Sequence, residues 1–239
     1  MHKYELKTIK EIYKMAKETN KQTEVSVEEV VNKSEAFLIK NKNTILGGIL
    51  AVVVIIAGVI CYNNFVSAPR ELKASEAMFK AEQYFQVGNF ELALNGDDLG
   101  SMGFVAVADE YSGTKAGNLA KAYAGISLAQ LKKYSEAMEY LKNFNADDAM
   151  IAPAVLGALG NCYAQLGEGE KAAATLVKAA AKSDSHSLSP IYLLQAGQIY
   201  ENLGQNAKAV EAYEQIKNKY FNSVQAYDID KYIERASAK

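Results

Sequence analysis

The hydrophobic pattern is dominated by one long apolar run in the first third of the chain. Residues 43–69 contain no charged side chain, and eleven of the eighteen residues from 45 to 62 are Ile, Leu or Val. As a helix, those eighteen residues span roughly 27 Å, close to the thickness of a bilayer's hydrocarbon core. Their side chains favour insertion by roughly 3 to 6 kcal/mol. The pattern therefore predicts a single transmembrane helix over residues 43–66.

Two other interpretations of this run fit less well. A buried core helix is seldom so uniformly apolar along its whole length. A cleaved signal peptide usually has an apolar region of about 7–15 residues near the N-terminus, whereas about forty residues come first here.

The basic residues around the run indicate its orientation. Three lysines precede it within about fifteen positions, and two basic residues follow it. Because an excess of Lys and Arg marks the cytoplasmic side, we expect residues 1–42 in the cytoplasm and residues 67–239 on the far side. The residues concerned are Lys33, Lys40 and Lys42 before the run, and Arg70 and Lys73 after it.

Two amphipathic patterns occur within residues 1–42. Apolar side chains recur at helical spacing through residues 1–20, and Ser26 followed by Glu29 is a capping box that predicts the start of a second helix. We expect a tail with short amphipathic helices. The pattern leaves open whether this tail docks on a partner or stays loosely ordered.

Beyond residue 70 the chain repeats itself. Four pairs of small residues occur, twelve positions apart within each pair, and the units recur at offsets of 44, 35 and 37 residues. Small residues let two antiparallel helices approach closely, and bulky residues one turn away fill the gaps between neighbouring pairs. The pairs are Ala81 and Ala93, Gly125 and Ala137, Gly160 and Ala172, and Gly197 and Ala209.

These units resemble the tetratricopeptide repeat, a helix pair of about 34 residues. The resemblance covers Ala74 to Phe221. In the first unit Ala81 replaces the usual Gly, and the second helix is interrupted at residues 94–102 before it resumes over Phe104–Tyr111. Pro153 and Pro190 stand where the third and fourth units begin, as helix N-terminal signals do.

A final helix over Ala226–Ala236 is expected to cap the stack. The predicted fold class is therefore all-α: one N-terminal transmembrane helix, then a tetratricopeptide solenoid of about four helix pairs with a C-terminal capping helix in residues 67–239.

Charge and cysteine content exclude several classes of protein. The formal net charge is −2, and a nucleic-acid-binding domain is usually clearly basic, so we expect no nucleic-acid partner. The chain has two cysteines, Cys61 and Cys162, and their distance in sequence rules out a disulfide framework.

Few residues invite a chemical interpretation. The Gly-rich pieces at 95–103 and 167–171 lack the Gly-Lys-Ser/Thr ending of a phosphate-binding loop. The pairs Asp97-Asp98 and Asp147-Asp148 fit no EF-hand spacing, and His186 has no Cys or acidic partner nearby in sequence. We interpret Cys162 as a packing residue. We therefore expect no enzyme activity, no metal site and no cofactor.

The inner wall of the solenoid gives a more specific hypothesis. In tetratricopeptide domains the first helix of each pair forms this wall, and here it has many amides and no Lys or Arg, so a basic clamp for a C-terminal carboxylate is missing. Amides bond an extended backbone as donors and acceptors; alternatively, they only solvate a helical face. In helical register the wall comprises Phe79, Glu82, Gln86, Tyr123, Ile126, Gln130, Ala158, Asn161, Gln165, Gln195, Gln198 and Asn202. The candidate peptide-binding residues are Tyr123, Gln130, Asn161, Gln165, Gln195, Gln198 and Asn202.

The layout of tail, early span and repeats resembles the YfgM type of ancillary Sec-translocon protein of the bacterial inner membrane. The phrases KYSEAMEYL, NCYAQLGEGEKAA and DIDKYIERA are similar to tetratricopeptide proteins of Bacteroidetes. The resemblance implies a single-pass protein with its repeats in the periplasm, acting as a chaperone or holdase. Its implied partners are the SecYEG translocon, emerging client polypeptides and periplasmic chaperones. A structural scaffold in an envelope secretion or motility assembly is the alternative.

Overall fold

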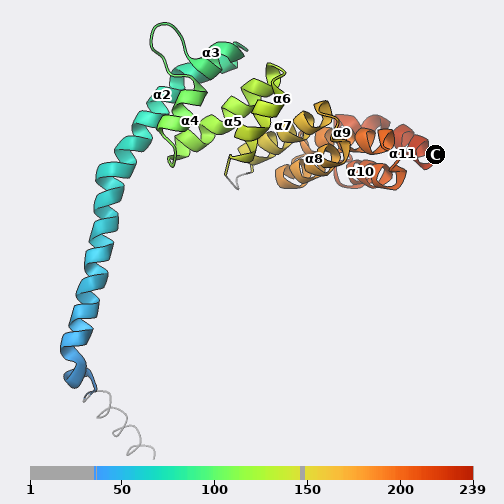
Figure 1. The fold of residues 1–239 in the computed structure, drawn as a ribbon. Helices are drawn as coiled ribbons and strands as arrows, with labels where there is room; N and C mark the ends of the chain where they lie inside the picture. The colour runs from blue at the N-terminus through green and yellow to red at the C-terminus, as the bar shows by residue number, and fades with distance from the viewer. Residues whose placement is uncertain (1–34, 36, 146–148, 239) are drawn as a thin grey trace, which may run out of the picture. The chain divides into compact units, whose positions relative to one another are not determined.

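The computed structural model describes residue 35 and residues 37–145 and 149–238 (Figure 1). The amphipathic patterns predicted for residues 1–34, and the pair Asp147-Asp148, lie outside the described residues. The chain divides into two compact units, Met1–Asn64 and Phe65–Lys239, and each is considered by itself.

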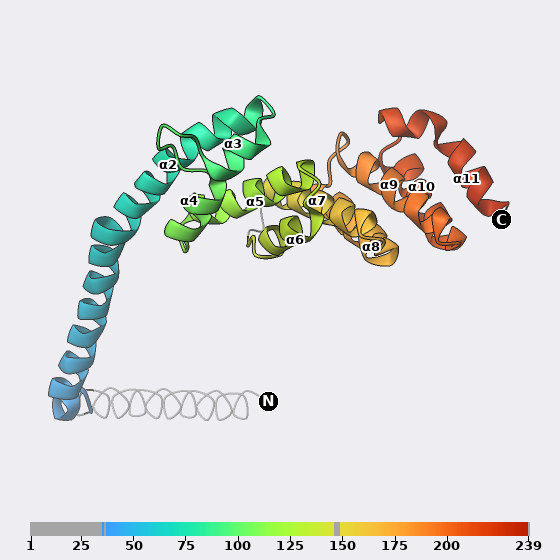
Figure 2. The same ribbon diagram turned by 45° about the horizontal axis from the view of Figure 1, so that its top comes forward.

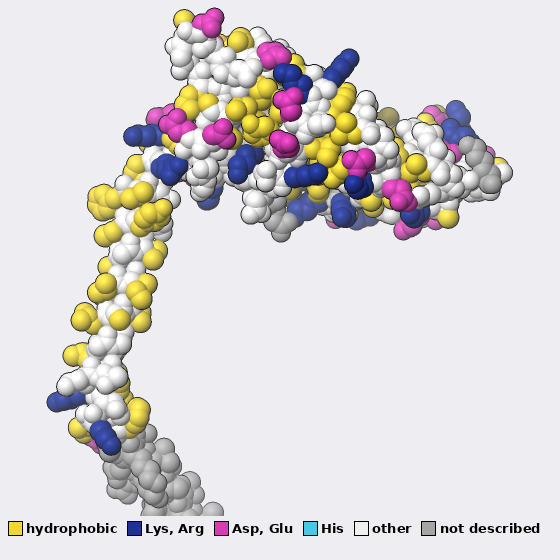
Figure 3. Space-filling view, in the orientation of Figure 1, with side chains coloured by type: hydrophobic (Ala, Val, Ile, Leu, Met, Phe, Trp, Pro, Cys, Tyr) yellow, Lys and Arg dark blue, Asp and Glu magenta, His cyan; other side chains and the backbone are white. Residues whose placement is uncertain are grey.

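In the first unit, residues 37–62 form one continuous α-helix. Its Ile, Leu and Val side chains are exposed along nearly the whole length, as at Leu50 (64% exposed) and Ile55 (65% exposed). Figure 3 shows hydrophobic side chains distributed along the visible surface of this helix. Helical backbone continues through a π-helical turn, Asn63–Ser67, so that the helix runs from Phe37 to Gln86. Within the described residues, this is the one helix long and apolar enough to cross a membrane.

The predicted span is thus compatible with single-pass anchoring, while its orientation stays a prediction. The helix itself extends beyond residues 43–66 at both ends, since the polar residues on either side of the apolar run are also helical.

The second unit consists of successive helices in the described residues, with one isolated bridge between Gly96 and Met102 and no strand. Figures 1 and 2 show α5 to α10 following one another as antiparallel pairs. The all-α solenoid predicted from the sequence is confirmed. The helices are α2 (Ala68–Gln86), α3 (Phe90–Asn95), α4 (Phe104–Glu110), α5 (Lys115–Gln130), α6 (Tyr134–Lys142), α7 (Ile151–Gln165), α8 (Gly169–Ser183), α9 (Ser189–Asn202), α10 (Asn206–Lys219) and α11 (Ile229–Ser237), with a 3-10 turn at Val224–Asp228.

Close approach of the two helices in each pair depends on the small residues. A Cβ atom added at Gly125 would lie 2.6 Å from Leu141 Cγ, and one added at Gly160 would lie 2.8 Å from Leu176 Cγ. At Gly197 the added atom would lie 2.2 Å from Cε1 of Tyr213. Their partners in sequence, Ala137, Ala172 and Ala209, are 0% exposed, and so are both small residues of the first pair, Ala81 and Ala93.

The turn inside each helix pair has the same backbone form. One residue with positive φ follows the first helix, and the next N–H donates to the carbonyl five positions earlier, which satisfies an otherwise unpaired carbonyl at the helix end. The positive-φ residues are Gly88, Lys132, Gly167 and Gly204, and the hydrogen bonds run from Asn89 to Tyr84, Lys133 to Leu128, Glu168 to Tyr163 and Gln205 to Tyr200 at 2.8–2.9 Å.

A buried ionic cluster fixes the C-terminal helix α11 to the last pair. Glu201 has a side chain only 5% exposed, and its carboxylate accepts from the Tyr213 hydroxyl at 2.9 Å and from Arg235 Nε at 3.0 Å. A second guanidinium nitrogen of Arg235 completes the fork. Because a buried charge needs such partners, α11 is held in one position, as the predicted capping helix requires.

We predict that substitution of two Lys residues in the middle of the span, Val53→Lys with Val54→Lys, prevents stable insertion. Each Lys costs about 2.5–3.5 kcal/mol at the centre of a membrane helix, so together they offset the favourable side-chain contribution. Fractionation of membranes washed with alkaline carbonate would measure the loss. Val54→Leu is the control and should stay in the membrane fraction; retention of the double Lys variant would contradict the span.

We predict that Gly197→Ala lowers the free energy of unfolding by about 1–3 kcal/mol. Alanine gains about 1 kcal/mol of helix propensity, but its methyl group would overlap the fully buried ring of Tyr213, and overpacking outweighs the gain. Urea unfolding followed by circular dichroism is the measurement. Lys178→Ala, at an exposed site on α8, should change stability by less than about 0.5 kcal/mol; an equal effect of both would refute the close approach.

Candidate peptide-binding groove

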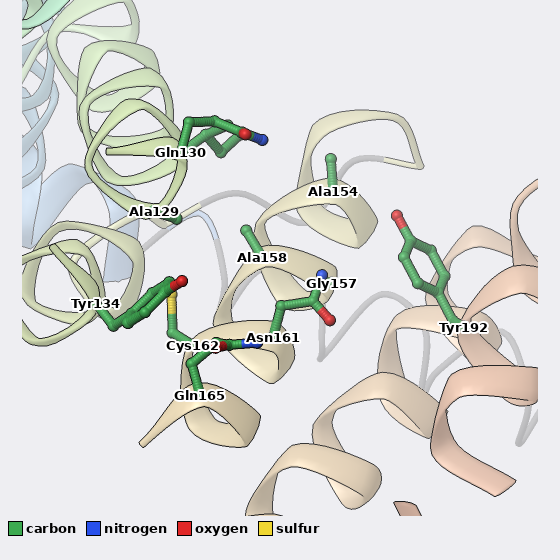
Figure 4. Close-up of a pocket in the computed structure, with 11 residues that line it drawn as sticks. Ala129, Gln130, Tyr134, Ala154, Gly157, Ala158, Asn161, Cys162, Gln165 and Tyr192 are labelled. Atoms are coloured by element: carbon green, nitrogen blue, oxygen red, sulfur yellow. The ribbon is translucent and has the colours of Figure 1, made fainter. Parts of the chain in front are cut away.

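A cavity of about 450 Å³ opens between the first helices of the second and third pairs (Figure 4). Of the residues predicted to form the binding wall, it brings together Gln130 from α5 with Asn161 and Gln165 from α7. Its lining is Ile126, Ala129, Gln130, Tyr134, Ala154, Gly157, Ala158, Asn161, Cys162, Gln165 and Tyr192.

The lining contains no charged residue, and its amides are available. Gln130, Asn161 and Gln165 are exposed and make no hydrogen bond to another described side chain or backbone group. Each amide offers two N–H donors and one oxygen acceptor. An extended peptide presents the same groups along its backbone, so this lining can bond any sequence without charge selection.

The other predicted residues lie elsewhere on the first helices. The ring of Tyr123 stacks on Phe104 with 4.9 Å between centroids and meets Phe85 edge-on at 5.0 Å, so part of it is committed to packing. The three residues on α9 lie outside the lining of the cavity, and their part in binding stays a prediction. They are Gln195, whose buried Oε1 has no partner in the described residues, with Gln198 and Asn202, which are exposed.

Sequence reasoning missed Tyr192, which closes one side of the cavity. A Cβ atom at Gly157 would lie 2.5 Å from Cε1 of this ring, so the missing side chain at Gly157 is what lets α9 contribute to the wall. Burial raises the pKa of Tyr192 and keeps its hydroxyl protonated. The sequence feature that could have indicated this contact is Gly157 itself, a further glycine on α7 three positions before Gly160.

Cys162 also lines this cavity. It is 0% exposed, and burial raises the pKa of its thiol. A protonated, covered thiol is a poor nucleophile, so its place in the lining is a matter of packing.

The matches to known families fall on these same helices. Residues 155–188 match the tetratricopeptide repeat family, and residues 191–217 match it again. The chain contains tetratricopeptide repeats. The matched stretches coincide with α7–α8 and α9–α10, and the tetratricopeptide close approach and turn recur in α5–α6. A comparison with the curated proteins found no significant match.

A second, smaller cavity of about 300 Å³ lies between α2 and α5 of the tetratricopeptide domain. One of its residues, Glu71, accepts from the backbone N–H groups of Lys115 and Ala116 at 2.7 Å, and so caps the start of α5. Another, Glu82, is half-buried, and no described residue forms a hydrogen bond or an ion pair with it. The α2–α5 cavity is lined by Glu71, Ser75, Met78, Glu82, Lys115, Ala116 and Leu119.

The Gly-rich loop between α3 and α4 is filled by its own backbone. An added Cβ would lie 2.1 Å from the Ser101 carbonyl oxygen at Gly96, and 2.2 Å from that of Leu94 at Gly103. Asp97 closes the loop, accepting from the Tyr84 hydroxyl at 2.7 Å and from the backbone N–H groups of Leu99 and Ser101 at 3.0 Å. These bonds explain why the second helix of the first tetratricopeptide unit stops and resumes.

The remaining polar motifs are surface features. Residues 167–168 of the 167–171 piece form the turn between α7 and α8, and residues 169–171 begin α8. His186 is exposed, with its ring 5.5 Å from that of Tyr220. Within the described residues, no three His, Cys, Asp or Glu side chains come together as a metal site would require.

We predict that the loop at 96–103 is acid-sensitive through Asp97. The Tyr84 hydroxyl and the Ser101 amide lower the pKa of Asp97 from 3.8 to about 2, so its stabilising contribution is present above about pH 4 and is lost as the pH falls through about 2. The protection factors of the Leu99 and Ser101 amides, which correct their exchange rates for the intrinsic pH dependence, should fall over that window.

In the Asp97→Asn variant these amides should have lower protection factors at pH 7 and should lose little further protection below pH 4. Asp98→Asn, at an exposed neighbour, should behave like the wild type. An equal loss of protection in acid in the Asp97→Asn variant would assign the sensitivity to another group.

Proposed function

We propose that this protein is a membrane-anchored chaperone or holdase whose tetratricopeptide groove holds extended or unfolded polypeptide. The observation that supports this most directly is the cavity between α5 and α7, whose lining is uncharged. Three amide side chains in it have no hydrogen-bond partner among the described residues. Such a wall bonds the backbone, which every client shares, and applies no charge selection of its own.

We further propose that the span holds the domain at the bacterial inner membrane, with the N-terminus cytoplasmic and the repeats in the periplasm. The long apolar helix supports the anchoring, and the excess of lysines before the span supports this orientation. By resemblance of layout, the SecYEG translocon would be the membrane partner, and emerging polypeptides or periplasmic chaperones the soluble ones.

A structural scaffold in an envelope secretion or motility assembly is the second candidate. It is favoured by apolar residues outside the groove: Phe221, Val224 and Tyr227, next to the capping helix, are 72%, 87% and 92% exposed. Large exposed apolar side chains close together mark surfaces that dock folded partners.

Site-specific photo-crosslinking separates the two candidates. A photoreactive residue is placed at Gln165 in the groove, at Val224 outside it, and at Ile55 in the span. Translocon subunits captured from Ile55, together with many unrelated nascent chains from Gln165, would support the chaperone. One stoichiometric folded partner captured from Val224, with nothing from Gln165, would support the scaffold.

We predict that the combined change Asn161→Ala, Gln165→Ala and Gln198→Ala weakens binding of an unfolded client by about tenfold or more. Three amides, each contributing about 0.5–1.5 kcal/mol as hydrogen-bond partners, are removed. Fluorescence anisotropy with a labelled, reduced and carboxymethylated protein measures the affinity.

The matched control removes three exposed amides that lie outside the predicted inner wall, two on α10 and one just after it: Gln215→Ala, Asn218→Ala and Asn222→Ala. It should leave the affinity unchanged. Equal affinities for the wild type and the groove variant would refute the assignment of the groove.

A further inference from the structure

Glu82 is the one charged residue on the predicted inner wall of the groove. It lines the α2–α5 cavity and is half-buried, and no described residue forms a hydrogen bond or an ion pair with its carboxylate. Partial burial raises its pKa. A carboxylate that has lost part of its water without gaining a partner is less stable than one that is paired.

The other charges of this cavity do not satisfy Glu82. Glu71 is occupied by the backbone amides at the start of α5. Lys115 lines the cavity, but it is an exposed residue and forms no ion pair with Glu82. The cavity is therefore complementary to one additional positive charge.

The two cavities lie on one face of the same helix. Leu119 lines the α2–α5 cavity, and Ile126 and Gln130 line the α5–α7 cavity; positions 119, 126 and 130 share a face at helical spacing. From Leu119 to Gln130 the helix rises roughly 16 Å. An extended chain covers that distance in about five residues.

We propose that the groove prefers extended polypeptides that carry a Lys or Arg, whose side chain enters the α2–α5 cavity and pairs with Glu82. The backbone about five residues away then lies against Gln130, Asn161 and Gln165. This preference rests on the proposed function, because it needs a peptide in the groove.

Charge complementarity favours a Lys or Arg side chain in the α2–α5 cavity over a neutral or acidic one. An ammonium or guanidinium group replaces the water that Glu82 has already lost and adds charge-assisted hydrogen bonds. An acidic side chain would meet two carboxylates and be repelled. Lys115 lines the cavity without pairing with Glu82, and the other residues of the predicted inner wall are neutral.

The test uses the full chain in detergent and three fluorescein-labelled peptides of about twelve residues, long enough to reach both cavities. They are built from Ala, Ser, Thr and Gln and differ only at the sixth position, which is Lys, Gln or Glu. Anisotropy should show the Lys peptide binding at least threefold tighter than the Gln peptide, with the Glu peptide weakest.

Glu82→Gln should abolish this order and bring the three affinities together, while its thermal unfolding stays close to that of the wild type. Glu76→Gln removes an exposed carboxylate from the same helix and should keep the order. Persistence of the Lys preference in Glu82→Gln, or a preference for the Glu peptide in the wild type, would overturn the inference.

Two further outcomes distinguish this inference from the proposed function. If all three peptides bind equally, and the triple Ala variant of the groove weakens them all, the groove stands and the assignment to Glu82 falls. If none of the peptides binds the wild type, both fall.

Discussion

The tetratricopeptide domain depends on the close contact of two helices at a small residue. Gly125, Gly160 and Gly197 each sit where a single methyl group would overlap a buried side chain of the partner helix. Because the interior is close-packed, this contact fixes the distance and register of each pair. The register then determines which side chains of the first helices form the inner wall. The groove is thus a consequence of packing, and its polar residues stand at positions that packing leaves free.

Much of this could be predicted from the sequence, since the contacts that define a pair are local and periodic. Small residues twelve positions apart, a turn between them and a bulky residue at the helix end are all visible in one window of the chain. The long apolar run was equally clear, because insertion depends on a sum over consecutive residues. The same local logic placed Gln130, Asn161 and Gln165 on one wall before the structure was known.

The parts that could not be predicted join residues far apart in sequence. Glu71 caps a helix that begins 44 residues later. Arg235 donates a hydrogen bond to Glu201, which lies 34 residues earlier in the sequence. Tyr192 enters the groove because Gly157, on a different helix, has no side chain. Tyr123 could be placed on the correct face, but its commitment to Phe85 and Phe104 follows from the broken helix of the first unit. None of these contacts corresponds to a periodic pattern of residues in the sequence.

A groove lined mainly by amides, with Glu82 as its one charged wall residue, binds an extended chain only weakly. Each new hydrogen bond replaces one to water and contributes about 1 kcal/mol. Under the proposed function, the membrane span compensates for that weakness. Two proteins held in one membrane near a translocation site meet at an effective concentration that free diffusion does not reach, commonly in the millimolar range. Weak binding then becomes useful, because a client held by backbone contacts and a single ion pair dissociates quickly enough to fold. A tight, charge-rich groove on the same anchor would retain its clients, and the absence of Lys and Arg from the wall avoids that outcome.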